Sequence, residues 1–263
     1  MDLLLNPTRD AAETLDTARA AEPLEYVRFR QRNLAQGETF TDNSGDLELC
    51  LVLLSGKATI RCGDHTFEAI GQRMSVFEQT PPYAVYLPND TDYSVEAITD
   101  VELGICGAPG HGNHAPRLIE PGDIKQSTRG EGANVRHVHD ILPETEPADS
   151  LLVVEVYTPA GNWSSYPPHK HDEDNLPQES FLEESYYHRL NPSRGFGLQR
   201  IYTDDRSIDE AMAFGDGSCV LVPRGYHPVG APYGCDLYYL NVMAGPKREW
   251  KFTTDPDFAW LVK

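Results

Sequence analysis

Short runs of β-branched and aromatic residues, each broken by Gly, Pro, Asn or Asp, make up most of this chain of 263 residues. Such runs are typical of antiparallel barrels and sandwiches, in which short strands follow one another through tight turns. Twenty prolines and twenty-one glycines supply the turn residues. Helical periodicity is scarce, with candidates at 10–21 and, more weakly, at 208–214. We therefore predict a mainly β fold.

The strand pattern occurs twice along the chain, which predicts two domains of similar type. In the first half, an apolar run at 47–54 precedes a hairpin signal at Gly63-Asp64. In the second half, a run at 184–190 precedes a turn at Asn191-Pro192. Each half then offers a Gly-rich run that closes on a Pro, as expected for a small barrel with hairpin connections.

The stretch 108–133 separates the two halves, because it is rich in Gly, Pro, His and charge and lacks the alternation of a strand. The chain is long enough for two domains of ordinary size. We predict an N-terminal jelly-roll-like barrel in 1–115, a linker in 116–135 and a C-terminal barrel in 136–263.

Charge and cysteine usage limit the classes of partner. The chain has 22 Lys and Arg against 41 Asp and Glu, a formal charge of −19 that would repel phosphate backbones and anionic lipid surfaces. We expect neither nucleic acid nor membrane partners. Five cysteines without a Cys-x-x-Cys pair favour buried free thiols in a reducing compartment. No convincing signal peptide or membrane helix is present, so we expect a cytoplasmic protein.

The strongest chemical signal is a group of histidines and carboxylates in the second half. His169 and His171 stand at i and i+2, a spacing that places both imidazoles on one face of an extended strand. A carboxylate from the pair Glu183-Glu184 and a third imidazole from His227 would complete a set of three His and one Glu. Such a set suits a divalent Zn, Mn, Fe or Ni ion and leaves positions open for substrate oxygens.

A second His-x-His pair, His137 and His139, precedes Asp140 and an apolar run without comparable partners. We interpret this pair as structural or as part of the surface.

The group around His169 resembles the metal site of the cupin superfamily. Its first motif places two His and a Glu on neighbouring strands, and its second places Pro-x-Gly before another His. The segment from Gly217 to His227 matches the second motif with one residue fewer before the His, whereas the spacer from His171 to the Glu pair is longer than usual.

Five longer runs are similar to the 5-deoxy-glucuronate isomerase family of bacterial inositol catabolism. They include Tyr-Pro-Pro-His-Lys-His-Asp at 166–172 and Val-Pro-Arg-Gly-Tyr-His-Pro at 222–228, with further runs at 182–189, 195–203 and 238–245. The resemblance implies a bicupin that converts 5-deoxy-glucuronate to 5-dehydro-2-deoxy-gluconate with a divalent ion. Zinc is favoured, since the related uronate isomerases of the pectin pathway bind it. We expect a small sugar-acid substrate and a homo-oligomer.

Adjacent residues on a strand point to opposite sides, so Glu183 and Glu184 cannot both face the ion. In cupins the liganding Glu usually opens the strand directly, which favours Glu184. The first half has a counterpart carboxylate, Glu48, but no His-x-His ahead of it. We therefore predict a first barrel without a metal site, in which Tyr83 and Tyr86 belong to the core or interface.

The base that moves a proton between C2 and C1 is not fixed by the sequence. Glu183, Tyr186, Tyr239 and Lys170 are of types that could serve if their pKa values were shifted towards neutrality. The substrate carboxylate requires a cationic partner, for which the candidates are Arg189, Arg200 and Arg224.

Two other classes of protein share such a site. A cupin with three His and one Glu can bind Fe or Ni and act as a dioxygenase, which would consume oxygen as an isomerase does not. A non-enzymatic sugar-binding bicupin would instead hold a structural ion closed to solvent.

Overall fold

The protein is described by a computed structural model that covers residues 2–8 and 11–262. Within these residues it is mainly β, and its helical segments are four 3₁₀ helices. They are η1 (Thr17–Arg19), η2 (Val76–Glu78), η3 (Gly132–Asn134) and η4 (Pro256–Leu261). No helix of this part of the chain is long and apolar enough to cross a membrane.

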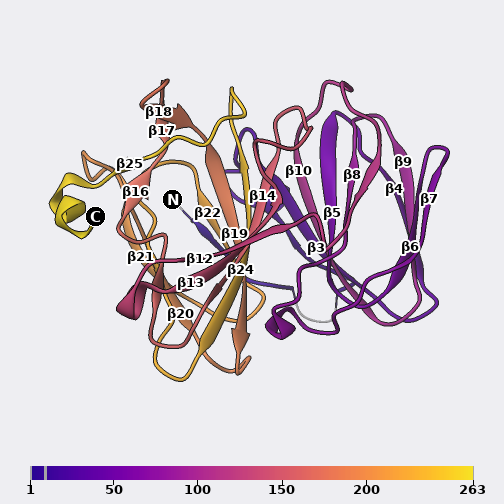
Figure 1. Cartoon of the computed structure of the whole chain (residues 1–263), viewed down its shortest axis with the longest axis horizontal. Helices are drawn as coiled ribbons and strands as arrows, with labels where there is room; N and C mark the ends of the chain where they lie inside the picture. Colours follow the sequence, from indigo (N-terminus) through magenta and orange to yellow (C-terminus); the bar gives the residue numbers. More distant parts are fainter. Residues whose placement is uncertain (1, 9–10, 263) are drawn as a thin grey trace.

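Two antiparallel sheets form the first half (Figure 1). The larger contains, in spatial order, β11 (Arg117–Ile119), β8 (Ala84–Leu87), β5 (Leu47–Ser55), β10 (Val101–Pro109), β3 (Arg28–Leu34) and β2 (Glu13–Asp16). The smaller contains β4 (Thr39–Asn43), β9 (Asp92–Ala97), β6 (Ala58–Cys62) and β7 (His65–Ile70). The predicted hairpin at Gly63-Asp64 joins β6 to β7.

The second half repeats this plan. Its large sheet contains β1 (Leu4–Leu5), β22 (Cys219–Val222), β19 (Glu183–Asn191), β24 (Asp236–Ala244), β14 (Leu152–Thr158), β13 (Arg136–Leu142) and β12 (Lys125–Arg129). The small sheet contains β15 (Trp163–Ser164), β23 (Val229–Gly230), β20 (Gly197–Tyr202) and β21 (Asp209–Phe214). Two short ribbons pair β16 (His169–Lys170) with β25 (Thr253–Thr254) and β17 (Asp172–Asn175) with β18 (Glu179–Phe181).

Three hydrophobic cores separate the four main sheets. One core lies between the two sheets of the first half and another between those of the second. The third contains residues of both large sheets, such as Val52 and Leu54 of β5 and Leu240 and Val242 of β24. The large sheets therefore pack face to face at the centre of the molecule, as Figure 1 shows. Because both faces are buried at the centre of each large sheet, central strands such as β5 and β14 are mostly apolar along their length.

Both predicted helices are wrong. Residues 209–214 form strand β21, which pairs with β20 along its whole length. Residues 13–16 form β2, and η1 follows it; Asp10 lies outside the described residues. Ala, Glu and Met favour helix locally, but pairing with a neighbouring strand outweighs this weak preference.

The segment predicted as a linker contributes β11 to the first half and β12 to the second. The first strand of the chain, β1, pairs with β22 in the second half. All five cysteines are free, and four of them are buried.

Candidate active site

Three imidazoles and one carboxylate converge inside the second half. The ligand nitrogens of His169, His171 and His227 lie within 4.8 Å of one another. His169 opens the short strand β16, and His227 follows β22 on a turn. Glu184 of β19 is 1% exposed, and its carboxylate lies 2.7 Å from Nε2 of His171 and 3.4 Å from Nε2 of His227.

The hydrogen bonds of two imidazoles fix which nitrogen faces the centre. Nδ1 of His171 donates to the carbonyl of Leu182 over 2.9 Å, and Nδ1 of His227 donates to the carbonyl of Gly225 over 2.8 Å. In the neutral form of each ring Nε2 therefore carries a lone pair, and both Nε2 atoms are buried without a hydrogen bond to any described residue. Lone pairs of nitrogen and carboxylate oxygen that face one another in a buried space fit a divalent cation.

The electrostatics of the four residues agree with an ionised carboxylate at Glu184 and with neutral imidazoles at His169 and His227. Burial lowers the pKa of His169 and of His227. Burial also acts downward on the pKa of His171, but the Glu184 carboxylate outweighs it and the net shift is upward. Burial would raise the pKa of Glu184, yet the neighbouring His171 and His227 lower it well below its usual range.

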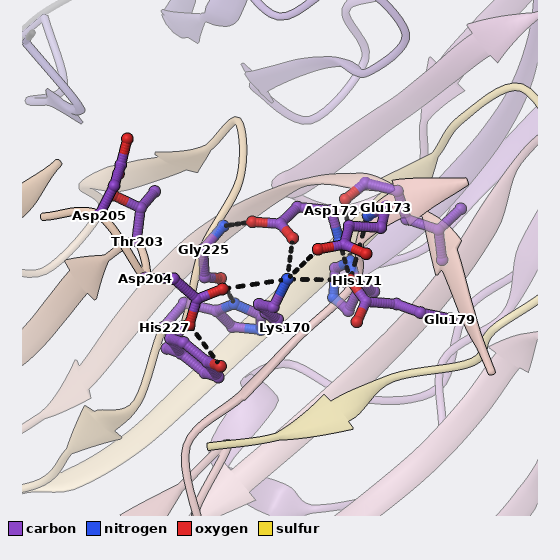
Figure 2. A network of polar contacts seen from close by, with 12 residues as sticks. Lys170, His171, Asp172, Glu173, Glu179, Thr203, Asp204, Asp205, Gly225 and His227 are labelled. Carbon is purple, nitrogen blue, oxygen red and sulfur yellow. Dashed lines mark hydrogen bonds and ion pairs between the residues drawn. The ribbon is translucent and has the colours of Figure 1, made fainter. Parts of the chain in front are cut away.

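A network of charges beside the site holds the segments that carry the imidazoles (Figure 2). Asp172 accepts from Nζ of Lys170 over 2.7 Å and from the backbone N–H of Gly225 over 2.9 Å. The carbonyl of the same Gly225 accepts from His227. Asp172 thus links the segment of His169 and His171 to the turn of His227, and through Gly225 it helps to orient the imidazole of His227.

A cavity of about 240 Å³ opens onto the site and gives it a place for a substrate. His169 and Glu184 contribute to its wall, together with Tyr186 and Tyr239. The hydroxyl of Tyr239 lies 2.7 Å from that of Ser164, and burial raises the pKa values of both tyrosines. Both phenols are therefore protonated at neutral pH and suited to donate hydrogen bonds.

Two of the four residues proposed as a base lie outside this cavity. The carboxylate of Glu183 accepts from the backbone N–H groups of Glu25 and Tyr26, over 3.1 and 2.7 Å. Lys170 is surrounded by carboxylates, as Figure 2 shows. Its Nζ lies 2.7 to 3.6 Å from those of Asp172, Glu173, Asp204 and Glu179.

The three arginines proposed for the substrate carboxylate also lie away from the cavity. Arg189 pairs with Glu102 and Asp216. Arg200 pairs with Asp209 on the surface, and Arg224 lies 3.3 Å from the hydroxyl of Ser207.

The cavity wall instead contains Arg129 and Arg136, which the sequence reading missed, together with Asn241. Nδ2 of Asn241 donates to Glu184 over 3.2 Å. The available signal was the alternation in 136–142, where Arg136 and Val138 share one face and the two histidines share the other. His139 accordingly points away from the cavity and bonds to Glu155 over 2.8 Å, while His137 bonds to Thr128.

Comparisons with known proteins agree with this fold and site. The model of the KduI/IolB family matches residues 3–261. A 5-deoxy-glucuronate isomerase of Geobacillus kaustophilus is 59% identical over 239 residues, 91% of this chain and 87% of that protein. The crystal structure of an IolB-like protein from Salmonella typhimurium LT2 is 50% identical, covers both chains completely and has a TM-score of 0.97.

A more distant structure shares the fold alone. Bacillus subtilis oxalate decarboxylase, described with Mn(II) centres, has a TM-score of 0.60 at 12% identity and covers 88% of this chain and 71% of its own. The fold is thus cupin-like, and the chain belongs to the KduI/IolB family.

Proposed function

We propose that this protein is a metal-dependent aldose–ketose isomerase that converts 5-deoxy-glucuronate to 5-dehydro-2-deoxy-gluconate. One observation carries the metal dependence: two buried Nε2 lone pairs and a carboxylate face one point beside a cavity. The isomerase activity follows from the relatives in the KduI/IolB family, which are 5-deoxy-glucuronate isomerases.

The ligands of the proposed ion are His169, His171, Glu184 and His227. Zinc suits three imidazoles and one carboxylate, and Mn, Fe and Ni suit the same donors. Manganese has further support in the Mn(II) centres of the oxalate decarboxylase with a similar fold. A bound divalent ion would supply Lewis acidity at the carbonyl oxygen and the adjacent hydroxyl of an open-chain sugar acid.

The cavity residues perform the remaining tasks of the reaction. Tyr186 and Tyr239, whose hydroxyls are protonated, donate hydrogen bonds to substrate oxygens that gain negative charge. The hydroxyl of Tyr186 lies 3.1 Å from that of Ser165, and the hydroxyl of Tyr239 lies 2.7 Å from that of Ser164. Of the four residues predicted as the base, Tyr186 and Tyr239 are the two that line this wall.

We also propose that each half is a cupin barrel, divided as 1–115, 116–135 and 136–263 apart from β1 and β12, which join the sheet of the second half, and that the first barrel is a scaffold. Glu48 supports this role, because its carboxylate accepts from three backbone N–H groups at 149–151 and not from imidazoles. We also propose that the protein works in inositol catabolism in the cytoplasm, a reducing compartment that suits its buried free cysteines.

The exposed aromatic rings of Tyr233 and Trp260 offer surface for a homo-oligomer, which light scattering would detect.

Metal analysis combined with turnover tests the function. The purified protein should contain about one divalent ion per chain and should consume the aldehyde of 5-deoxy-glucuronate without consuming oxygen. His227→Ala should lose most of the metal and the activity while circular dichroism stays unchanged, because His227 lies between strands β22 and β23 and not within either. Oxygen uptake would indicate a dioxygenase, and metal-replete protein without turnover would indicate a sugar-binding protein.

A further inference from the structure

Two arginines face each other across the hairpin of β12 and β13, and both line the cavity of the active site. Arg129 ends β12 and is the direct partner of Arg136, which begins β13. Like charges placed opposite one another on neighbouring strands destabilise a hairpin. A chain with 41 acidic and 22 basic residues has many carboxylates available to pair with such a cluster.

Arg136 is not neutralised by any of them within the described part of the chain. Its guanidinium donates to the carbonyl of Asn134 over 3.1 Å and forms no ion pair with a described carboxylate. The side chain is half-buried, and burial, with Arg129 nearby, lowers its pKa. Arg129 is only partly neutralised, by Asp140 at 3.5 Å, and it lies over the ring of Trp250.

Arg129 also lines a second cavity next to that of the active site. Arg129, Val154 and Trp250 also line a neighbouring cavity of about 620 Å³, whose described lining contains none of the four ligands. Arg129 therefore lies where the two cavities adjoin, and Arg136 lies opposite it in the wall of the active-site cavity.

We propose that Arg136, supported by Arg129, binds the carboxylate of the sugar acid and so directs its aldehyde end towards His169 and Glu184. This inference rests on the proposed function, since it concerns the same site. A planar guanidinium matches a carboxylate with two parallel hydrogen bonds, and a partly buried one has few competing water molecules. The substrate would neutralise a cluster that the fold leaves positive, which makes Arg136 a determinant of specificity for acids over neutral sugars.

The test compares Arg136→Gln with the unchanged protein on two substrates, 5-deoxy-glucuronate and its neutral C6 amide. Loss of one charge-assisted pair should raise KM for the acid by roughly ten- to hundredfold, and KM for the amide should change by less than about threefold. The turnover number should fall much less than KM rises, because the contact is remote from C1 and C2. Arg136→Lys should restore part of the difference, since it keeps the charge without the two-pronged geometry.

Metal content and unfolding temperature are measured on each variant, so that a distorted site is recognised. Arg61→Gln is the matched control, because Arg61 forms an exposed pair with Glu96 in the first half. An unchanged KM for the acid in Arg136→Gln, or an equal rise for acid and amide, would overturn this inference while leaving the isomerase intact. No turnover by the metal-replete, unchanged protein would overturn the proposed function and this inference with it.

Discussion

Glu183 and Glu184 are neighbours in sequence, but their side chains lie on opposite faces of β19. Glu184 faces the imidazoles, whereas Glu183 faces the first half and accepts from two of its backbone N–H groups. The alternation of a strand predicts that only one of them faces the metal site. Alternation does not predict that Glu183 is 7% exposed and bonds to the first half. This contact depends on a segment more than 150 residues away in the sequence.

We predict that substitution of Glu184 weakens metal binding, whereas substitution of Glu183 lowers the stability of the fold. Glu184→Gln removes the charge of a ligand and should release the metal under mild chelation. Glu183→Gln should retain the metal but lower the free energy of unfolding by about 1–3 kcal/mol, since backbone donors lose a charged acceptor. Chelation curves and urea denaturation of the metal-free proteins distinguish these effects. Equal retention of metal by both variants would remove Glu184 from the set of ligands.

The second His-x-His pair permits a further residue-scale prediction. His139 is buried against Glu155 in the central core, and His137 bonds to Thr128 at the surface. Replacing both by Ala should leave metal content unchanged and should lower stability, because Glu155 loses one partner in a buried position. Loss of the ion from a folded double mutant would mean that this pair contributes to the metal site.

At the scale of elements, motifs whose partners are close in sequence were predictable, and contacts between distant segments were not. His169, His171 and His227 follow from strand spacing and a Gly-containing turn. Arg129 and Arg136 were missed because they lie in or next to a stretch whose Gly, Pro and charge resemble a linker. The strand β12 in that stretch forms by pairing with β13, which in turn pairs with β14, a strand whose position follows from the packing of both halves.

The turn of His227 provides a prediction at this scale. Gly225 has φ of +92°, and a Cβ there would lie 2.6 Å from the carbonyl oxygen of Tyr202. Gly225→Ala should therefore shift the carbonyl that orients His227, weakening metal binding as well as stability. Gly63→Ala is the control, since Gly63 has φ of +52° and open space around it. Metal affinity unchanged in Gly225→Ala would show that the turn does not position the ligand.

At the scale of the whole molecule, each half contains a buried carboxylate that accepts hydrogen bonds from backbone N–H groups of the other half. Glu48 of the first half accepts from N–H groups at 149–151, and Glu183 of the second accepts from 25 and 26. Arg73 crosses the central core to form a two-pronged pair with Glu155, both oxygens at 2.9 Å. These contacts accompany a shared apolar core, so we expect the halves to unfold together in one transition.

The Arg73–Glu155 pair makes stability depend on pH in a specific range. Burial alone would raise the pKa of Glu155, but Arg73 and His139 outweigh it and lower the pKa from 4.5 to about 2. The hydroxyls of Tyr157 and Tyr238 also bond to this carboxylate. Because the folded state holds the ionised form, the stabilisation is fully present above pH 4.5 and is lost as the pH falls towards 2.

We therefore predict that Glu155→Gln is less stable at pH 7 by about 3–5 kcal/mol, since it leaves the Arg73 guanidinium buried without a counter-charge. Its free energy of unfolding should also fall less than that of the unchanged protein between pH 5 and 2, because one titrating group has been removed. Denaturation at several pH values measures both effects. Glu96→Gln, at an exposed pair, should keep the original pH slope. Parallel slopes for Glu155→Gln and the unchanged protein would show that the ionisation of Glu155 is not coupled to folding.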